Sequence, residues 1–268
     1  MEVKYDTFNQ KNYSLNFEIL LSGEIFEEYY DVFGCGTFVL VGLLSLVKNY
    51  YYEIEHIGES GYVYGLRRAL IVSIFIIVWS SRLVIFLNDR IKRNKKDKRF
   101  DKVRNNPKKF FIYWFMQSLW INFTITPLLL VTHQHFSISL SLIDYILILL
   151  WSTFFTIEAV ADGQKTLFLG KPENKGKFIN QGLWKRLCRH PNYFSEIMMH
   201  WIIYFICFRG LDSYWYKFIS LISPLFISFL MLKISTPMME KISDEKFSGN
   251  PQYQEYKKST YKIIPFIN

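Results

Sequence analysis

Cysteine, glycine and proline are all scarce in this chain. Of its 268 residues, 3 are Cys, 13 are Gly and 8 are Pro. Three widely separated cysteines do not form a disulfide framework or a cysteine-based zinc site, so we expect no metal centre. The low glycine and proline contents exclude collagen-like and low-complexity classes. Half of the residues are hydrophobic, which excludes a disordered chain.

The N-terminus lacks the features of a targeting segment. MEVKYDTFNQ has no basic start followed by an apolar run, and arginine is absent from the first sixty residues. This pattern indicates neither a cleavable signal peptide nor a transit peptide. Residues 1–32 are acidic and aromatic, and we expect them to lie at the membrane interface.

Long apolar runs dominate the rest of the chain. Residues 110–131 contain no charge, and a helix needs about 20 apolar residues to cross a bilayer. Five further runs carry few charges: 32–47, 69–87, 140–161, 192–208 and 214–232. The sequence therefore predicts an all-α fold, a polytopic membrane bundle of about six transmembrane helices over residues 33–232. Residues 233–268 would form a C-terminal tail on the cytoplasmic or matrix side.

Positive charge is concentrated in one stretch. The net charge is +9, and residues 89–109 alone contain eleven Lys or Arg and three Asp. A basic run can bind nucleic acid, but between two apolar runs it is typical of a cytoplasmic loop beside membrane helices. We therefore expect no nucleic-acid partner. Loops 89–109 and 162–191 should lie on the cytoplasmic or mitochondrial-matrix side together with both termini.

Several polar residues fall within the predicted spans, where such residues are costly and usually functional. Arg82 would either extend towards the basic loop or bind a ligand or a carboxylate. Tyr113 and Gln117 share one face of the third span, a pattern that more often joins helices than forms a site. Glu158 and Asp162 repel each other one turn apart. Either a positive group faces them, or they mark the exit of the helix into water.

The most informative stretch is GLWKRLCRHPNYFSEIMMHW, residues 182–201. Pro191 suits the first turn of a helix, so a helix is predicted to begin there and enter the membrane. Arg186, Arg189 and His190 precede the positively polarised end of this helix, a combination that favours an anion such as phosphate.

The same helix carries a polar stripe. Asn192, Glu196 and His200 are four residues apart and share one face, which suits the lining of a polar cavity better than contact with lipid. The alternative for the whole stretch is a basic anchor at the interface followed by a packed helix.

These residues resemble a known family. RHPNYFSE, with WSSRLVIFLNDR, EAVADGQKTLF, YQEYKKST and the terminal IIPFI, is similar to the DUF1295 membrane proteins, relatives of steroid 5α-reductases. The resemblance covers about residues 30–268. It implies a helical bundle that holds NADPH on its cytosolic side in the endoplasmic reticulum membrane. The reaction would reduce a C=C bond conjugated to a ketone in a lipid or steroid-like substrate.

The resemblance also implies site residues. Those expected around the cofactor are Asp162, Arg189, His190, Asn192, Tyr193 and Glu196. Further candidates are Lys165, Arg186, Tyr253, Tyr256 and, from its place on the second span, Arg82. No GxGxxG motif is present, so a Rossmann domain is not expected. Because Lys and Arg outnumber Asp and Glu from residue 162 to 191, NADPH should bind better than NADH.

One departure from the family pattern leaves the general acid unassigned. Steroid 5α-reductases polarise the ketone with a tyrosine and a glutamate, whereas the WSSR stretch offers Trp79 and two serines. The remaining catalytic candidates are Glu158, Gln117 and Tyr113. An alternative is therefore a reductase-fold subunit without activity, in contact with other subunits of a membrane assembly such as one in the mitochondrial inner membrane. A further alternative is an isoprenylcysteine-type methyltransferase, which shares the RHPNY block.

Overall fold

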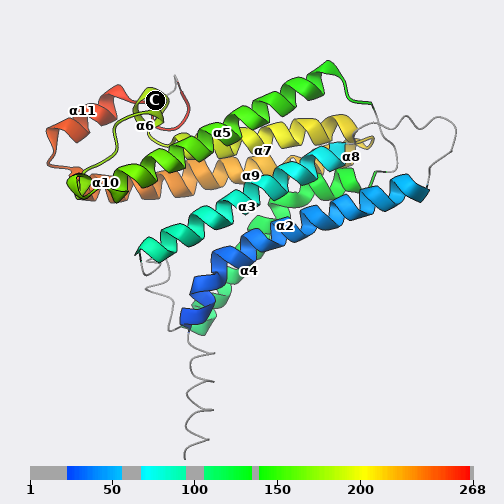
Figure 1. The fold of residues 1–268 in the computed structure, drawn as a ribbon, viewed down its shortest axis with the longest axis horizontal. Helices are drawn as coiled ribbons and strands as arrows, with labels where there is room; N and C mark the ends of the chain where they lie inside the picture. Colours follow the sequence, from blue (N-terminus) through cyan, green and yellow to red (C-terminus); the bar gives the residue numbers. More distant parts are fainter. Residues whose placement is uncertain (1–22, 56–67, 95–105, 135–138, 266–268) are drawn as a thin grey trace, which may run out of the picture. The chain divides into compact units, whose positions relative to one another are not determined.

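The computed structural model describes residues 23–55, 68–94, 106–134 and 139–265, and within these ranges it contains helices and no strands. The all-α prediction is confirmed. The elements, drawn in Figure 1, are α2 (Gly23–Glu55), α3 (Arg68–Asn94), α4 (Pro107–Thr132), α5 (Leu142–Gly170), η2 (Pro172–Asn174), α6 (Leu183–Arg186), α7 (Pro191–Gly210), α8 (Tyr214–Ser220), α9 (Ile222–Phe229), the π-helical η3 (Leu230–Ser235), α10 (Thr236–Phe247) and α11 (Pro251–Ser259).

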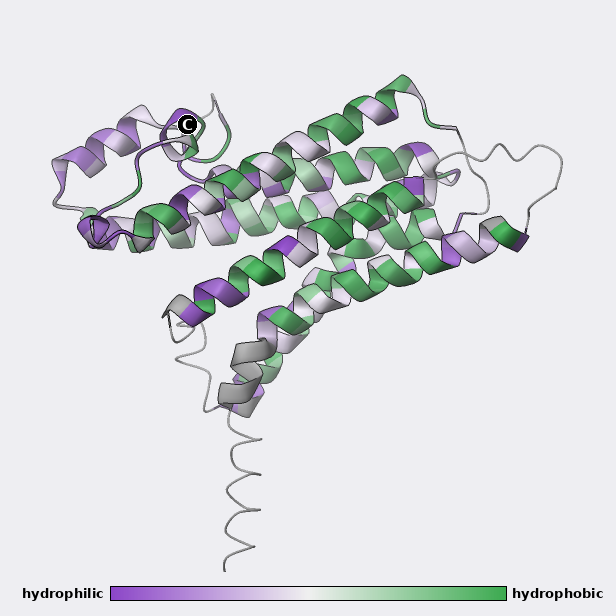
Figure 2. Ribbon diagram, viewed as in Figure 1, coloured by the Kyte–Doolittle hydropathy of each residue, from purple (hydrophilic) through white to green (hydrophobic). Residues whose placement is uncertain are grey.

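Five helical stretches are long and apolar enough to cross a membrane, and they indicate an integral membrane protein. They are Tyr30–Tyr52, Arg68–Lys92, Lys108–Thr132, Leu142–Gly170 and Tyr214–Phe247. Figure 2 shows the hydrophobic colour along most of α5 and α9, and the hydrophilic colour on α11. The count agrees roughly with the expected six, and the side on which each loop lies stays a prediction.

The remaining expected span, residues 192–208, forms helix α7 but is not among the five. Its polar stripe interrupts the apolar run. Half of its twenty residues are buried, and it packs against α5 and α9. His200 and Ser195 of α7 are buried, and Asn192 and Glu196 are partly buried. Ionisable residues of membrane helices usually face the interior of the bundle in this way.

Helix ends differ from the sequence expectation in several places. Helix α5 continues to Gly170, so the loop expected at residues 162–191 starts at Lys171, nine residues later than predicted. Helix α2 already begins at Gly23, and the last of the five membrane-length stretches extends to Phe247, into the predicted tail. Hydropathy marks where a helix leaves the membrane, whereas good helix formers such as Gln and Lys continue it into water. Residues 1–22 and 95–105 lie outside the described residues.

The chain divides into two compact units, and the first contains residues 1–46 and 73–122. In this unit the buried ring of Phe38 lies 5.4 Å from Trp79 and 4.9 Å from Trp120, centroid to centroid. A Cβ atom on Gly42 would lie 2.6 Å from the side chain of Ile77, so glycine permits the close approach of α2 to α3.

The second unit contains residues 47–72 and 123–268. In it α5 and α7 run antiparallel, because Asn192 at the start of α7 contacts Asp162 near the end of α5, and Arg209 contacts Asp144 at the other end. Helix α9 packs on the other side of α7, where the Trp201 indole donates a hydrogen bond of 3.1 Å to Ser228 Oγ.

A buried ionic cluster joins α3, α5 and α7 in the second unit. Asp144 is completely buried, and Arg68 is only 4% exposed. Arg68 donates from Nε and Nη2 to the two Asp144 oxygens at 2.9 and 2.8 Å, and Arg209 donates from Nε to the same carboxylate at 3.3 Å. Ser141 donates to it from its backbone and its hydroxyl. The cluster anchors the start of α5 to the end of α7.

The π-helical segment η3 changes the register of α10 against α7. His190 contacts Glu240, and Trp201 contacts Ser228. The first members of these two pairs are eleven residues apart (201 − 190), whereas the second members are twelve apart (240 − 228). A π turn accommodates one additional residue, and Thr236 N–H indeed donates to Met231, five residues earlier. The insertion therefore turns Glu240 towards the start of α7.

Candidate functional site

The start of α7 is built as the sequence predicted. Pro191 occupies the first helical position, and His190 is the N-cap residue. The preceding Arg189 is tied to the C-terminal segment, because its backbone N–H donates to the Tyr261 carbonyl oxygen at 2.8 Å. The expected cationic residues thus stand at the helix start, held by a segment about seventy residues further along the chain.

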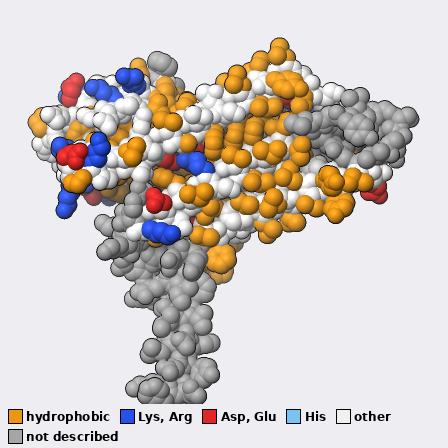
Figure 3. All heavy atoms as spheres, in the orientation of Figure 1, with side chains coloured by type: hydrophobic (Ala, Val, Ile, Leu, Met, Phe, Trp, Pro, Cys, Tyr) orange, Lys and Arg blue, Asp and Glu red, His pale blue; other side chains and the backbone are white. Residues whose placement is uncertain are grey.

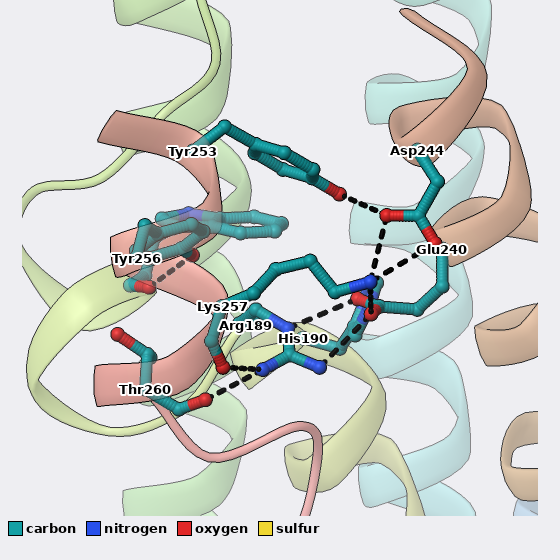
Figure 4. A network of polar contacts seen from close by, with 9 residues as sticks. Arg189, His190, Glu240, Asp244, Tyr253, Tyr256, Lys257 and Thr260 are labelled. Atoms are coloured by element: carbon teal, nitrogen blue, oxygen red, sulfur yellow. Dashed lines mark hydrogen bonds and ion pairs between the residues drawn. The ribbon is translucent and has the colours of Figure 1, made fainter. Parts of the chain in front are cut away.

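A polar network centred on Glu240 surrounds this helix start (Figure 4). The Arg189 guanidinium donates from Nε and Nη2 to the two Glu240 oxygens at 3.1 and 2.9 Å. Its Nη1 donates to the carbonyl oxygens of Lys257 and Thr260 at 2.8 and 2.6 Å. Arg189 therefore connects α7, α10 and α11, and all three of its nitrogens are used within the protein.

His190 contacts the same carboxylate, with Nε2 lying 2.8 Å from Glu240 Oε1. Because a carboxylate only accepts hydrogen bonds, Nε2 carries the proton. Burial lowers the pKa of His190 from its ordinary value of 6.5, and this effect outweighs the hydrogen bond to Glu240, which raises it. The imidazole is therefore neutral near pH 7.

This neutral histidine makes stability depend on pH. The unfolded chain binds a proton at His190 more readily than the folded protein does. The contribution of His190 to the free energy of unfolding is therefore fully present above pH 6.5 and is lost as the pH falls below it. Thermal unfolding in detergent between pH 7.5 and 5.5 should show a falling midpoint. The unfolding midpoint of His190→Gln should change less with pH over this range. An equally steep profile in the variant would assign the dependence to other groups.

Helix α11 completes the network. The Tyr253 hydroxyl donates to Asp244 Oδ1 at 2.9 Å, and Lys257 Nζ lies 2.7 Å from the same oxygen. The Tyr256 hydroxyl donates to the backbone carbonyl of Trp184 on α6. Burial raises the pKa of both tyrosines, so both remain protonated donors.

These elements enclose a cavity of about 250 Å³. Five of the sequence candidates line it: Lys165, Arg189, His190, Tyr253 and Tyr256. The remaining lining residues are Leu169, Lys177, Phe178, Ile179, Trp184, Met239, Glu240, Ile242, Ser243, Lys246 and Phe247. Figure 3 shows charged side chains gathered over α10 and α11 on the face that it displays. A cavity with aromatic walls and four cations against one acid is suited to a flat anionic ligand.

The other candidates on α5 and α7 form a neighbouring group that does not line this cavity. The Asn192 amide donates to Asp162 Oδ1 at 3.2 Å, and its own oxygen is buried without a hydrogen-bond partner among the described residues. The Tyr193 ring stacks on His190 at 5.5 Å, and Glu196 follows one turn later, half-buried. Glu158 is 3% exposed, one turn before Asp162.

The remaining candidates lie elsewhere. Arg186 is exposed and does not line the cavity. Arg82, Tyr113 and Gln117 belong to the first unit. There the Gln117 amide donates to the backbone oxygen of Tyr30 at 2.7 Å, which is the helix-joining role that its pattern more often has.

Sequence reasoning missed Glu240, Asp244, Lys177 and Lys246 as site residues. Lys177 falls within the predicted basic loop 162–191, and Glu240, Asp244 and Lys246 fall within the predicted tail 233–268. One signal was present: Glu240 and Asp244 are four residues apart, so they share one face of a helix and call for a positive partner.

The fold and the cavity define an integral membrane protein with a cationic, aromatic site at a polar end of its second unit. The chain belongs to the DUF1295 family, described as "Protein of unknown function", which matches residues 24–260. This confirms the family that the sequence motifs indicated. Searches of the curated proteins and of the solved structures returned no match.

Proposed function

We propose that this chain is a membrane reductase that uses NADPH to reduce a C=C bond conjugated to a ketone in a lipid or steroid-like substrate. The observation that carries the proposal is one cavity that gathers Lys165 from α5, Arg189 and His190 from the start of α7, and Tyr253 and Tyr256 from α11. The resemblance of the motifs to steroid 5α-reductases supplies the reaction class and a location in the endoplasmic reticulum membrane.

The residues present fit a dinucleotide. Its phosphates match the lysines of the cavity, and its adenine ring matches the aromatic walls. The buried, unpartnered oxygen of Asn192 needs a donor, which a ribose hydroxyl or a carboxamide N–H would supply. A cavity of about 250 Å³ encloses only part of a dinucleotide, so the remainder would extend towards Asn192 and Asp162.

The chain's own residues have three tasks in this proposal, since the cofactor when bound supplies the hydride. Lysines at the cavity neutralise phosphate charge, and Asn192 with Asp162 orients the polar end of the ligand. The apolar faces of the membrane helices admit a lipid-like substrate and exclude water. Glu158, buried in α5, is our candidate for the group that protonates the product.

Asn192→Ala should raise KM for NADPH about tenfold in an enone-dependent assay of NADPH oxidation, because the ligand loses one hydrogen bond to a buried acceptor. The thermal midpoint should change little, since the Asn192–Asp162 contact is 3.2 Å long and half-buried. Asn122→Ala is the matched control, because Asn122 is exposed on α4 and donates to Ser118 of its own helix. If purified protein neither binds nor oxidises NADPH with any enone, the reductase proposal is wrong.

One observation favours a second function, that of a reductase-fold subunit without activity. Arg189 and His190, which the motifs imply at the cofactor, are engaged with Glu240 instead. In a structural subunit this network would only hold α10 and α11 in place. Such a protein would co-purify with other membrane subunits, for example of the mitochondrial inner membrane, and would bind no dinucleotide.

A further inference from the structure

We infer that Lys177 and Lys246 select the phosphorylated dinucleotide by binding the 2′-phosphate of NADPH at the edge of the cavity. The inference rests on the proposed function and extends it to the residues that set cofactor specificity. Both lysines line the cavity, and both are exposed, so their ammonium groups can meet an anion that enters from water.

Arg189 is the residue that the sequence pattern favours for this role, and the structure assigns it elsewhere. Its three guanidinium nitrogens donate to Glu240 and to the carbonyl oxygens of Lys257 and Thr260. Four of its five N–H groups are thus donated within the protein, and its positive charge is already paired with Glu240. The phosphate charge must therefore be balanced by other cations.

The charge balance of the cavity leaves Lys177 and Lys246 for this task. Among the described lining residues Glu240 is the one acid, and Arg189 and Lys257 lie within 2.9 and 3.8 Å of it. Of the three remaining lysines, Lys165 lies 4.7 Å over the Trp184 ring. Lys177 and Lys246 are exposed and form no ion pair with a described residue, so they offer two positive charges to an anion. A phosphate monoester carries between one and two negative charges near pH 7 and matches them.

Two Lys-Phe dipeptides from distant parts of the chain create this arrangement. Lys177 is followed by Phe178, Lys246 is followed by Phe247, and the two phenyl rings lie 5.6 Å apart in an edge-to-face contact. The contact brings the segment after η2 against the end of α10. Aromatic rings beside two ammonium groups offer a stacking surface for adenine next to a phosphate site.

The test compares NADPH and NADH binding to the purified full-length protein in detergent by isothermal titration calorimetry. We expect wild type to prefer NADPH, and each of Lys177→Ala and Lys246→Ala to reduce that preference about fivefold, since exposed charge pairs are modest. The double variant should bind both cofactors with nearly equal affinity, while its NADH affinity stays unchanged. Lys175→Ala and Lys241→Ala are matched controls, exposed lysines that do not line the cavity.

The outcomes separate the inference from the proposed function. A preference for NADPH that survives in the double variant overturns the inference and leaves the reductase intact. Equal affinity of the wild type for NADPH and NADH would also overturn the inference and leave the reductase intact. If wild type binds neither dinucleotide in a folded sample, the proposed function fails as well. An equal loss in the control variants would show general attraction by the basic surface and would also overturn the assignment.

Discussion

Glu240→Gln should reduce the free energy of unfolding by about 3 kcal/mol. The substitution removes the negative charge of a largely buried ion pair and leaves the positive charge of Arg189 without its partner. Arg189 and Glu240 are only 10% and 12% exposed, and His190 and Lys257 also contact the carboxylate. Glutamine preserves the volume, so the loss would report charge and hydrogen bonding rather than a cavity. The thermal midpoint in detergent measures the change.

The same substitution should release the C-terminal helix before the membrane helices unfold. Helix α11 is held by Arg189, which Glu240 orients, and by the contacts of Tyr253 and Lys257 with Asp244. Limited proteolysis should therefore cut within residues 248–265 in the variant and spare wild type. Glu245→Gln is the control, since Glu245 is 67% exposed and forms only a long ion pair of 4.0 Å with Lys241 among the described residues. Equal proteolysis of both variants would contradict this role for Glu240.

Asp144→Asn should have the largest effect on the second unit, a loss of about 3–5 kcal/mol. The substitution leaves Arg68, which is almost fully buried, and Arg209 without the carboxylate that both contact. Ser141 donates both of its hydrogen bonds to Asp144 Oδ2, and Arg68 donates to both carboxylate oxygens. An asparagine keeps only one acceptor oxygen, so at least one of these donors loses its partner. We expect a lower midpoint and poor expression of folded protein.

Two further variants make the Asp144 result specific. Asp212→Asn removes an exposed acid just beyond the end of α7, three residues after Arg209, and should leave the midpoint unchanged. Arg209→Ala should cost less than Asp144→Asn, because its guanidinium is 32% exposed and its ion-pair distance is 3.3 Å. If Asp144→Asn and Asp212→Asn unfold at the same temperature, the buried cluster does not stabilise the fold.

Local patterns in the sequence were enough to determine the helices and one end of the site. Apolar run lengths located the membrane helices, and Pro191 located the start of α7, because both signals depend on residues that are adjacent in the chain. The motif resemblance identified the DUF1295 family. It also named Lys165, Tyr253 and Tyr256, which the structure places on one cavity although almost ninety residues separate the first from the others.

What those residues contact was decided by tertiary structure. The sequence presents Arg189 as a cation beside a helix start. Only the folded structure shows that Glu240 of α10, fifty-one residues away, already pairs with it. That pairing depends on the additional residue absorbed by the π-helical segment, which no hydropathy pattern reveals. Lys177 and Lys246 line the same cavity, beside the contact between Phe178 and Phe247. Contacts between distant segments depend on how helices pack, and this information is spread over the whole chain rather than held in any one motif.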